Sequence, residues 1–125
     1  MPVAWSDGLS VGIAEIDGQH RKLLGLMNGL EAALGHGRDA AALDRIARQM
    51  ADYARYHFAA EERRMDYALY PDAAAHKAEH AEFRAEAESL LAAGRPGPAL
   101  DFLRGWLLTH IQGTDRKLGA FLQGM

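Results

Sequence analysis

The sequence of 125 residues contains no cysteine. This absence excludes disulfide bonds, cysteine-ligated iron–sulfur clusters, thiolate zinc sites and thiol nucleophiles. A metal bound by this chain would therefore have to be held by nitrogen and oxygen atoms alone. Six histidines are present, and their positions are the most informative feature of the sequence.

The sequence also lacks a surplus of basic residues, an apolar run of transmembrane length and a signal-peptide pattern. Lys and Arg number 14 against 17 Asp and Glu, and the basic residues are scattered, so no basic face for nucleic acid or acidic lipid is expected. No apolar run approaches the roughly 20 residues that cross a bilayer, and no basic segment precedes an apolar one at the N-terminus. We therefore expect a soluble cytoplasmic protein that binds neither nucleic acid nor a membrane.

Composition and length predict one folded domain over residues 1–125. Hydrophobic residues make up 49% of the chain and charged residues 25%, which is typical of a folded protein, and the length suits a single core. Residues 1–16 contain one Pro, two Gly and two Ser, which favour an ordered N-terminal arm over a helix. Trp5 and Ile13 are its expected anchors on the core.

Residues 17–123 carry a helical pattern. Apolar residues recur at steps of three and four in four segments separated by short turns that contain Gly or Pro, which predicts four helices. Asp17, Asp39 and Asp72 are the expected N-caps of the first three helices, and Pro98 fits the first turn of the last. No alternating strand pattern is present, so the fold class is all-α, an up-down-up-down four-helix bundle with an N-terminal arm.

Histidines stand on the apolar stripes of all four predicted helices. The five are His20 on the first helix, His57 on the second, His76 and His80 on the third and His110 on the fourth. Glu61 follows His57 by four residues and therefore shares its face. Burying a lone carboxylate costs several kcal/mol, about as much as a small domain can lose. These residues must therefore pair with one another or surround a cation.

Each residue also has an ordinary structural interpretation. A single histidine on an apolar stripe is more often a hydrogen-bonded core residue than a ligand, and His57 with Glu61 could be a surface pair. The coincidence on four helices, with ligand pairs one turn apart on two of them, favours a metal site. The sixth histidine, His36, lies between two glycines at a helix end and is assigned to solvent.

The ligand types restrict the metal. Five imidazoles are too many for one zinc ion, and calcium and magnesium prefer oxygen ligands. Five nitrogens with one or two carboxylates suit two transition-metal ions bridged by carboxylate. A ferritin-like di-iron site would need a Glu-x-x-His motif on each of two helices; the nearest approach here ends in His20 and begins with Asp17. Neutral imidazoles favour reversible oxygen binding over strong oxidation chemistry.

The motifs, taken in order, resemble the hemerythrin family and its single-domain bacterial members over nearly the whole chain. They comprise the arm from Trp5 to Gly12, Ile16-Asp17-x-Gln19-His20, His57-Phe58-Ala59-Ala60-Glu61-Glu62-x-x-Met65, Tyr70-Pro71, His76-x-x-x-His80-x-x-Phe83 and Trp106-Leu107-x-x-His110-Ile111-x-x-x-Asp115. The resemblance implies a non-haem di-iron centre that binds dioxygen reversibly for transport, storage or delivery.

The resemblance also implies a role for each ligand. His76, His80 and His110 would bind one iron and His20 and His57 the other, with Glu61, Asp115 and an oxo or hydroxo group as bridges. Dioxygen would bind end-on at the two-histidine iron and be held as hydroperoxide while both irons pass from ferrous to ferric. Trp106, Leu107 and Ile111 flank His110 and would line an apolar oxygen pocket, although plain core packing explains each of them as well.

One spacing conflicts with a regular helix. His110 and Asp115 are five residues apart, or about 140° around an α-helix, so they should not share a face. We hypothesise a local π-type widening near Gly113, since such bulges occur at functional sites. Glu62 is the less suitable alternative for the bridge that Glu61 would make, because it lies on a neighbouring face.

Three other functions stay open on the sequence alone. An oxygen or redox sensor would normally be fused to a signalling domain, and this chain ends at Met125, directly after its last predicted helix. An enzyme acting on peroxide or nitric oxide would need an acid–base group, for which only Tyr53 or Tyr56 can be argued, and weakly. A structural bundle would hold zinc or no metal. Besides dioxygen, an unidentified redox or oxygen-consuming protein is the expected kind of partner.

Overall fold

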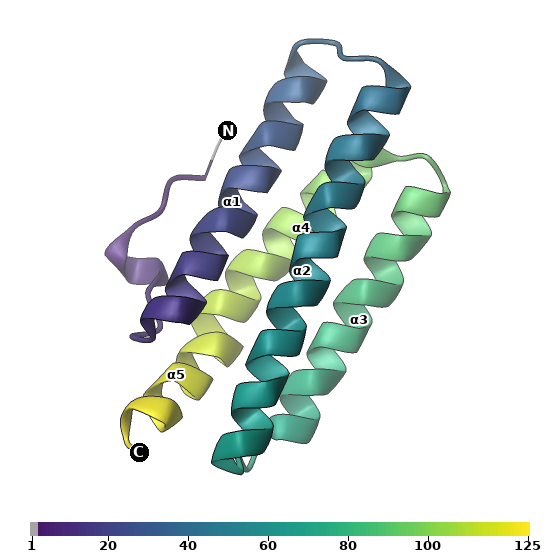
Figure 1. Ribbon diagram of the computed structural model, residues 1–125. Helices are drawn as coiled ribbons and strands as arrows, with labels where there is room; N and C mark the ends of the chain where they lie inside the picture. Colours follow the sequence, from purple (N-terminus) through teal and green to yellow (C-terminus); the bar gives the residue numbers. More distant parts are fainter. Residues whose placement is uncertain (1–2) are drawn as a thin grey trace.

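The computed structural model describes residues 3–125, which form helices and connecting segments without a strand. The elements in chain order are the short 3-10 helix η1 (Asp7–Leu9), α1 (Ala14–Gly35), α2 (Ala40–Ala68), α3 (Ala73–Ala92), α4 (Pro96–His110), the π-helical segment η2 (Ile111–Asp115) and α5 (Arg116–Gln123). The last three follow one another without a break and form one long helix (Figure 1).

Four long helices pack side by side, each antiparallel to the next along the chain (Figure 1). Helix α1 contacts α2, α2 contacts α3, α3 contacts α4, and α1 closes the bundle against α4. The predicted all-α, up-down-up-down bundle is therefore confirmed. Its helices span the whole bundle, so residues of all four can meet at one level of the core.

Two of the predicted helix boundaries have the expected chemistry. Asp39 is the N-cap of α2, and its carboxylate accepts a hydrogen bond from the backbone N–H of Ala42 at 2.8 Å. Helix α4 begins at Pro96, and Pro98 is its third residue, in the first turn as expected, where a missing N–H breaks no bond within the helix. Asp72 stands at the N-cap position of α3 without making a cap bond. Its carboxylate instead contacts Lys117 at 2.6 Å.

The prediction that Asp17 caps the first helix is wrong. Helix α1 already begins at Ala14, and Asp17 lies inside its first turn. The Asp17 carboxylate accepts hydrogen bonds from Ser10 Oγ at 2.5 Å and from the backbone N–H of Val11 at 2.9 Å. The Asp17 carboxylate is used by the N-terminal arm, because a backbone N–H of the arm needs an acceptor where the arm meets α1.

The N-terminal arm is anchored by more than the two expected residues. Trp5 and Ile13 are half-buried against the core, whereas Leu9 and Val11 are each only 4% exposed. Gly119 of α5 allows this packing, because a Cβ at that position would lie 2.0 Å from the Val11 carbonyl oxygen. The arm thus ties the beginning of α1 to the end of the chain (Figure 1).

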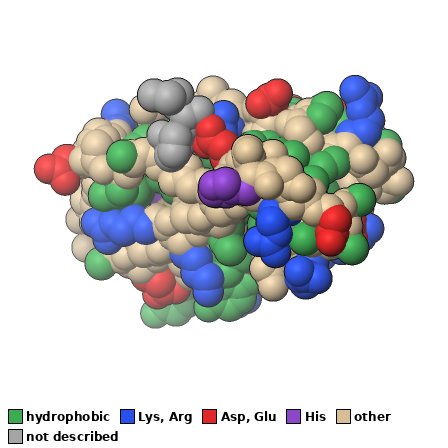
Figure 2. Space-filling model, turned by 90° about the horizontal axis from the view of Figure 1, so that it is seen from above, with side chains coloured by type: hydrophobic (Ala, Val, Ile, Leu, Met, Phe, Trp, Pro, Cys, Tyr) green, Lys and Arg blue, Asp and Glu red, His purple; other side chains and the backbone are tan. Residues whose placement is uncertain are grey.

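The apolar core runs along the bundle axis, and its largest wholly buried side chains include Phe58, Met65 and Ile111. On the face shown in Figure 2, Lys and Arg side chains lie among Asp and Glu side chains, without a patch of one sign. Among the helices of residues 3–125, none has both the length and the apolar composition that crossing a membrane requires.

Candidate metal centre

The structure brings all seven predicted ligand residues together inside the bundle. They are His20 from α1, His57 and Glu61 from α2, His76 and His80 from α3, His110 from the end of α4 and Asp115 from η2. Each is at most 2% exposed. Their ligand atoms fall into two groups that share the two carboxylates.

Glu61 lies between the two groups of histidines. Its Oε1 atom is 3.3 Å from His76 Nε2 and 3.1 Å from His80 Nε2. Its Oε2 atom is 3.2 Å from His57 Nε2 and 3.7 Å from His20 Nε2. One carboxylate oxygen therefore faces each group.

Asp115 repeats this division from the opposite helix. Its Oδ1 atom is 3.0 Å from His76 Nε2 and 3.1 Å from His110 Nε2, whereas Oδ2 is 3.0 Å from His20 Nε2. The imidazoles are thus divided into a set of three (His76, His80 and His110) and a set of two (His20 and His57). Both carboxylates join the two sets.

These contacts have metal-ligand spacing without being hydrogen bonds. Both oxygens of Glu61, both of Asp115 and Nε2 of His20, His57 and His76 are buried and make no hydrogen bond, which is costly for polar atoms inside a protein. Two ligand atoms about 2.1 Å from one shared ion and at right angles to each other lie about 3.0 Å apart. Six of the seven nitrogen–oxygen separations, 3.0 to 3.3 Å, lie close to that value, and only that between His20 and Glu61 is wider, at 3.7 Å. The donor set therefore fits transition-metal ions with nitrogen and oxygen ligands.

Three of the imidazoles have a hydrogen-bond acceptor at the other ring nitrogen. His57 Nδ1 lies 2.6 Å from Gln19 Oε1, His80 Nδ1 lies 2.9 Å from Glu62 Oε2, and a third contact of this kind is made by His110. An acceptor at Nδ1 places the proton there and leaves Nε2 with a free lone pair. These rings are therefore prepared for binding a metal through Nε2.

The His80 and His110 rings show the same preparation in their mutual contact. Their Nε2 atoms are 3.2 Å apart, although each ring carries its proton on Nδ1 and so presents a lone pair. Two lone pairs repel at this distance unless a cation lies beside both. The close approach therefore also indicates a cation site.

The carboxylates make the cluster strongly attractive to positive charge. Burial by itself favours neutral imidazoles, but the adjacent carboxylates of Asp115 and Glu61 outweigh it and raise the pKa of His20 and of His76 to about 9. Burial likewise opposes ionisation of both carboxylates, yet the neighbouring histidines hold the pKa of Glu61 and of Asp115 far below the usual range. The cluster thus attracts cations.

The π-type widening near Gly113 is present. Residues 111–115 form a π-helical turn between two α-helical stretches, and Asp115 is fully buried within 3.1 Å of His110 Nε2. The extra residue in the widened turn lets positions five apart share a face. The hypothesis drawn from the His110–Asp115 spacing is therefore confirmed.

Aromatic and apolar side chains enclose the imidazoles. Phe58 stacks on His80 with ring centroids 4.0 Å apart, and Trp106 stacks on His110 at 4.3 Å. Leu107 is buried one turn before His110, and Ile111 is buried directly after it. These side chains therefore surround the imidazoles with apolar groups on the α4 side, where Trp106 and His110 also line a surface cavity of about 320 Å³.

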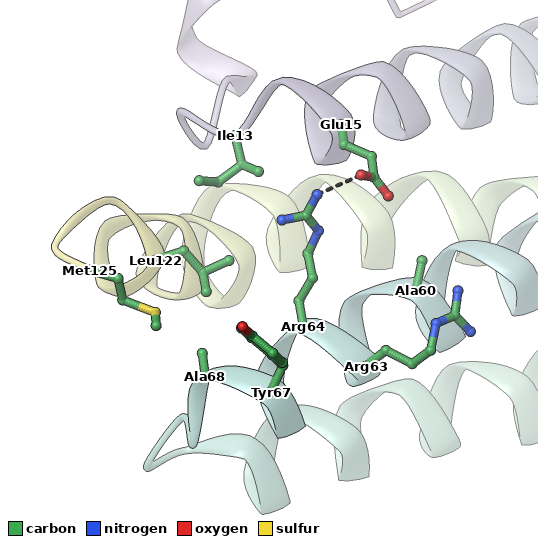
Figure 3. Close-up of a pocket in the computed structure, with 9 residues that line it drawn as sticks. All are labelled: Ile13, Glu15, Ala60, Arg63, Arg64, Tyr67, Ala68, Leu122 and Met125. Atoms are coloured by element: carbon green, nitrogen blue, oxygen red, sulfur yellow. Dashed lines mark hydrogen bonds and ion pairs between the residues drawn. The ribbon is translucent and has the colours of Figure 1, made fainter.

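A surface cavity of about 570 Å³ lies elsewhere and contains none of the seven ligand residues. It is formed by the beginning of α1, the second half of α2 and the end of α5, and Arg64 spans it to Glu15 at 2.5 Å (Figure 3). His36, assigned to solvent from the sequence, is exposed. Neither feature takes part in the cluster.

Sequence reasoning missed the acceptors that orient the rings. Glu62 was weighed only as a substitute for Glu61, whereas it accepts from His80; Gln19 and Glu79 had no role. A usable signal was present, since an imidazole ligand normally needs an acceptor at its second nitrogen. Glu79 and Gln19 each directly precede a ligand histidine in the chain.

Comparisons with known proteins agree with this geometry. The family model described as hemerythrin HHE cation binding domain matches residues 11–122. A bacteriohemerythrin of Stenotrophomonas maltophilia is 37% identical over 91% of this chain and 77% of its own length, and a hemerythrin-like protein of Naegleria gruberi is 33% identical over 97% and 94%. A crystal structure of wild-type hemerythrin superposes with a TM-score of 0.88 at 26% identity, covering 98% of both chains. The chain belongs to the hemerythrin family.

Proposed function

We propose that this protein binds dioxygen reversibly at two iron ions and serves oxygen storage or delivery. The ligands are those of the cluster already described, with His76, His80 and His110 on one iron, His20 and His57 on the other, and Glu61 and Asp115 on both. Bound iron would supply the electrons that dioxygen takes on binding and returns on release.

The unequal division of ligands is the observation that supports this proposal. The three-histidine position has three nitrogens and one oxygen from each carboxylate, whereas the two-histidine position has two nitrogens and the two remaining oxygens. If one further bridging oxygen were shared, the three-histidine position would offer six ligand atoms and the two-histidine position five, which would leave room for one more ligand there. An open position on one iron is what a small ligand such as dioxygen requires.

The protein's own residues favour reversible binding by excluding water and by holding the ligand rings in place. Leu107 and Ile111 are buried beside His110, and we propose that with Trp106 they form the apolar pocket in which oxygen is held. Water that reaches such a pocket speeds the loss of bound oxygen as a reduced product. The Nδ1 acceptors keep the imidazoles fixed while the charge on the metals changes.

The test is a spectroscopic oxygen titration of the iron-loaded protein. Metal analysis should first give two irons per chain, which a zinc-bound or metal-free structural bundle would not. The protein is then reduced without air, exposed to oxygen and evacuated again. A visible charge-transfer band that appears with oxygen and disappears on evacuation supports a carrier. Rapid irreversible conversion to the ferric state would overturn it in favour of sensing or of turnover of peroxide or nitric oxide.

A further inference from the structure

Glu79 on α3 holds two groups of the last helix at once. Its Oε1 atom accepts hydrogen bonds from His110 Nδ1 at 2.9 Å and from Thr114 Oγ1 at 2.8 Å, and its Oε2 atom lies 3.0 Å from the same hydroxyl. The Glu79 side chain is 43% exposed, whereas the His110 ring is buried. A surface carboxylate therefore reaches the outer nitrogen of a ring whose inner nitrogen belongs to the metal cluster.

The two groups that Glu79 holds lie at either end of the π-helical turn. His110 ends α4, and Thr114 is the residue directly before the buried Asp115 in η2. In a regular α-helix Thr114, four residues after His110, would share the inward face, and Asp115 would not. The bond from Thr114 to Glu79 holds the hydroxyl outside the cluster, which is the register that turns Asp115 inward.

We propose that Glu79, together with Thr114, is a positioning residue that fixes the His110 ring and makes it a more strongly donating ligand of the three-histidine iron than it would be without this carboxylate. This rests on the proposed function for the iron itself. An ionised acceptor at Nδ1 increases the basicity of the ring, and hydrogen bonds to charged groups are about twice as strong as those between neutral ones.

The acceptors of the other rings make the two metal positions unequal. Two rings of the three-histidine set donate to carboxylates, Glu79 and Glu62, whereas His57 of the two-histidine set meets the neutral amide of Gln19. Negative charge beside a ligand stabilises the more highly charged ferric ion. The three-histidine iron is therefore the one whose ferric state is favoured by the surroundings.

Four substitutions in the full-length iron-loaded protein test this role. Glu79→Gln keeps an acceptor and removes the charge, and Glu79→Ala removes both. Thr114→Val removes the hydroxyl, whereas Thr114→Ser keeps it. Glu82→Gln, at an exposed position three residues further along α3, is the matched control. The measurements are the midpoint potential of the iron pair, the rate of iron release to a chelator and backbone hydrogen exchange over residues 110–116.

The expected results separate positioning from general stability. Glu79→Gln raises the potential, with the ferric/ferrous ratio changing about tenfold, or 59 mV for one electron, while hydrogen exchange stays as in the unsubstituted protein. Glu79→Ala releases iron about 10 to 100 times faster. Thr114→Val speeds hydrogen exchange in the widened turn, whereas the Thr114→Ser protein exchanges at the rate of the unsubstituted protein. Glu82→Gln changes none of these quantities.

A potential for Glu79→Gln equal to that of Glu82→Gln would overturn the proposal, as would unchanged iron release in Glu79→Ala. These outcomes are distinct from failure of the proposed function. If oxygen binding is irreversible but the potentials shift as stated, the inference stands without the carrier role. If oxygen binds reversibly in every variant and all variants have the same midpoint potential, the carrier role stands and the inference fails.

Discussion

Replacing Gly119 with Ala should detach the N-terminal arm from the last helix. The added Cβ would lie 2.0 Å from the Val11 carbonyl oxygen and 2.9 Å from Val11 Cβ. Ordinary contact begins near 3.4 Å, so the arm must move by more than 1 Å, because backbone cannot swing aside as a side chain does. The hydrogen bond from the Val11 N–H to the buried Asp17 carboxylate, 2.9 Å long, cannot survive that movement.

The size of the effect follows from these losses. A hydrogen bond to a charged group contributes about 1.5 to 3 kcal/mol, and overpacking a well-filled contact costs about 1 to 3 kcal/mol. We expect Gly119→Ala to lower the free energy of unfolding by about 3 kcal/mol. For a chain of this size that corresponds to a fall of about 10 °C in Tm, measurable by calorimetry or circular dichroism on the metal-free protein.

The control is the same substitution at a glycine with open surroundings. Gly25, in the middle of α1, has nothing within 4 Å of its virtual Cβ and is exposed. Gly25→Ala should stabilise the protein by about 0.5 to 1 kcal/mol through helix propensity. A Gly119→Ala protein as stable as the Gly25→Ala protein would refute the close packing of the arm on α5.

Three further substitutions test separate parts of the molecule. Leu107→Ala should speed autoxidation of the oxygenated protein by admitting water to the proposed pocket, followed as decay of the visible band; a rate equal to that of half-buried Leu108→Ala would remove Leu107 from the pocket. Asp115→Asn should bind fewer than two irons, because an amide lacks the second anionic oxygen that faces His20, and elemental analysis showing two would contradict its bridging role. Asp17→Asn should cost about 1 to 2 kcal/mol in urea unfolding through weaker bonds to the arm, with iron content unchanged; a matching loss of iron would mean that the arm supports the metal site directly.

The fold was predictable because its helices bury continuous apolar stripes. Four segments with steps of three and four, broken by residues such as Gly35 and Pro71, define the bundle before any tertiary contact is considered. The first helix boundary was not predictable from local signals. Asp17 has the residue type of an N-cap, but the arm uses its carboxylate, so helix α1 begins three residues earlier at Ala14.

The inner ligands could be located from the sequence, and the outer acceptors could not. A histidine such as His57 interrupts an apolar stripe, so its position conflicts visibly with the pattern around it. An acceptor such as Glu79 lies on the polar face, where a carboxylate is ordinary. Glu79 on α3 is distinguished from its exposed neighbours only by its contact with α4, in which Glu79 Oε1 lies 2.9 Å from His110 Nδ1.

The π-helical turn carries both an inner ligand, which the sequence predicts, and a residue that contacts an outer acceptor, which it does not. Helical periodicity shows that Asp115 does not fit the face of His110, and it predicts a widened turn near Gly113. The structure distributes the widening over residues 111–115, and its two possible registers differ in which residue faces the cluster. In the observed register the Asp115 side chain points inward and contacts both groups of histidines. The Thr114 side chain points outward and donates a hydrogen bond to Glu79. Because one register satisfies both contacts, a turn that is rare in helices is stabilised from the inside and the outside together.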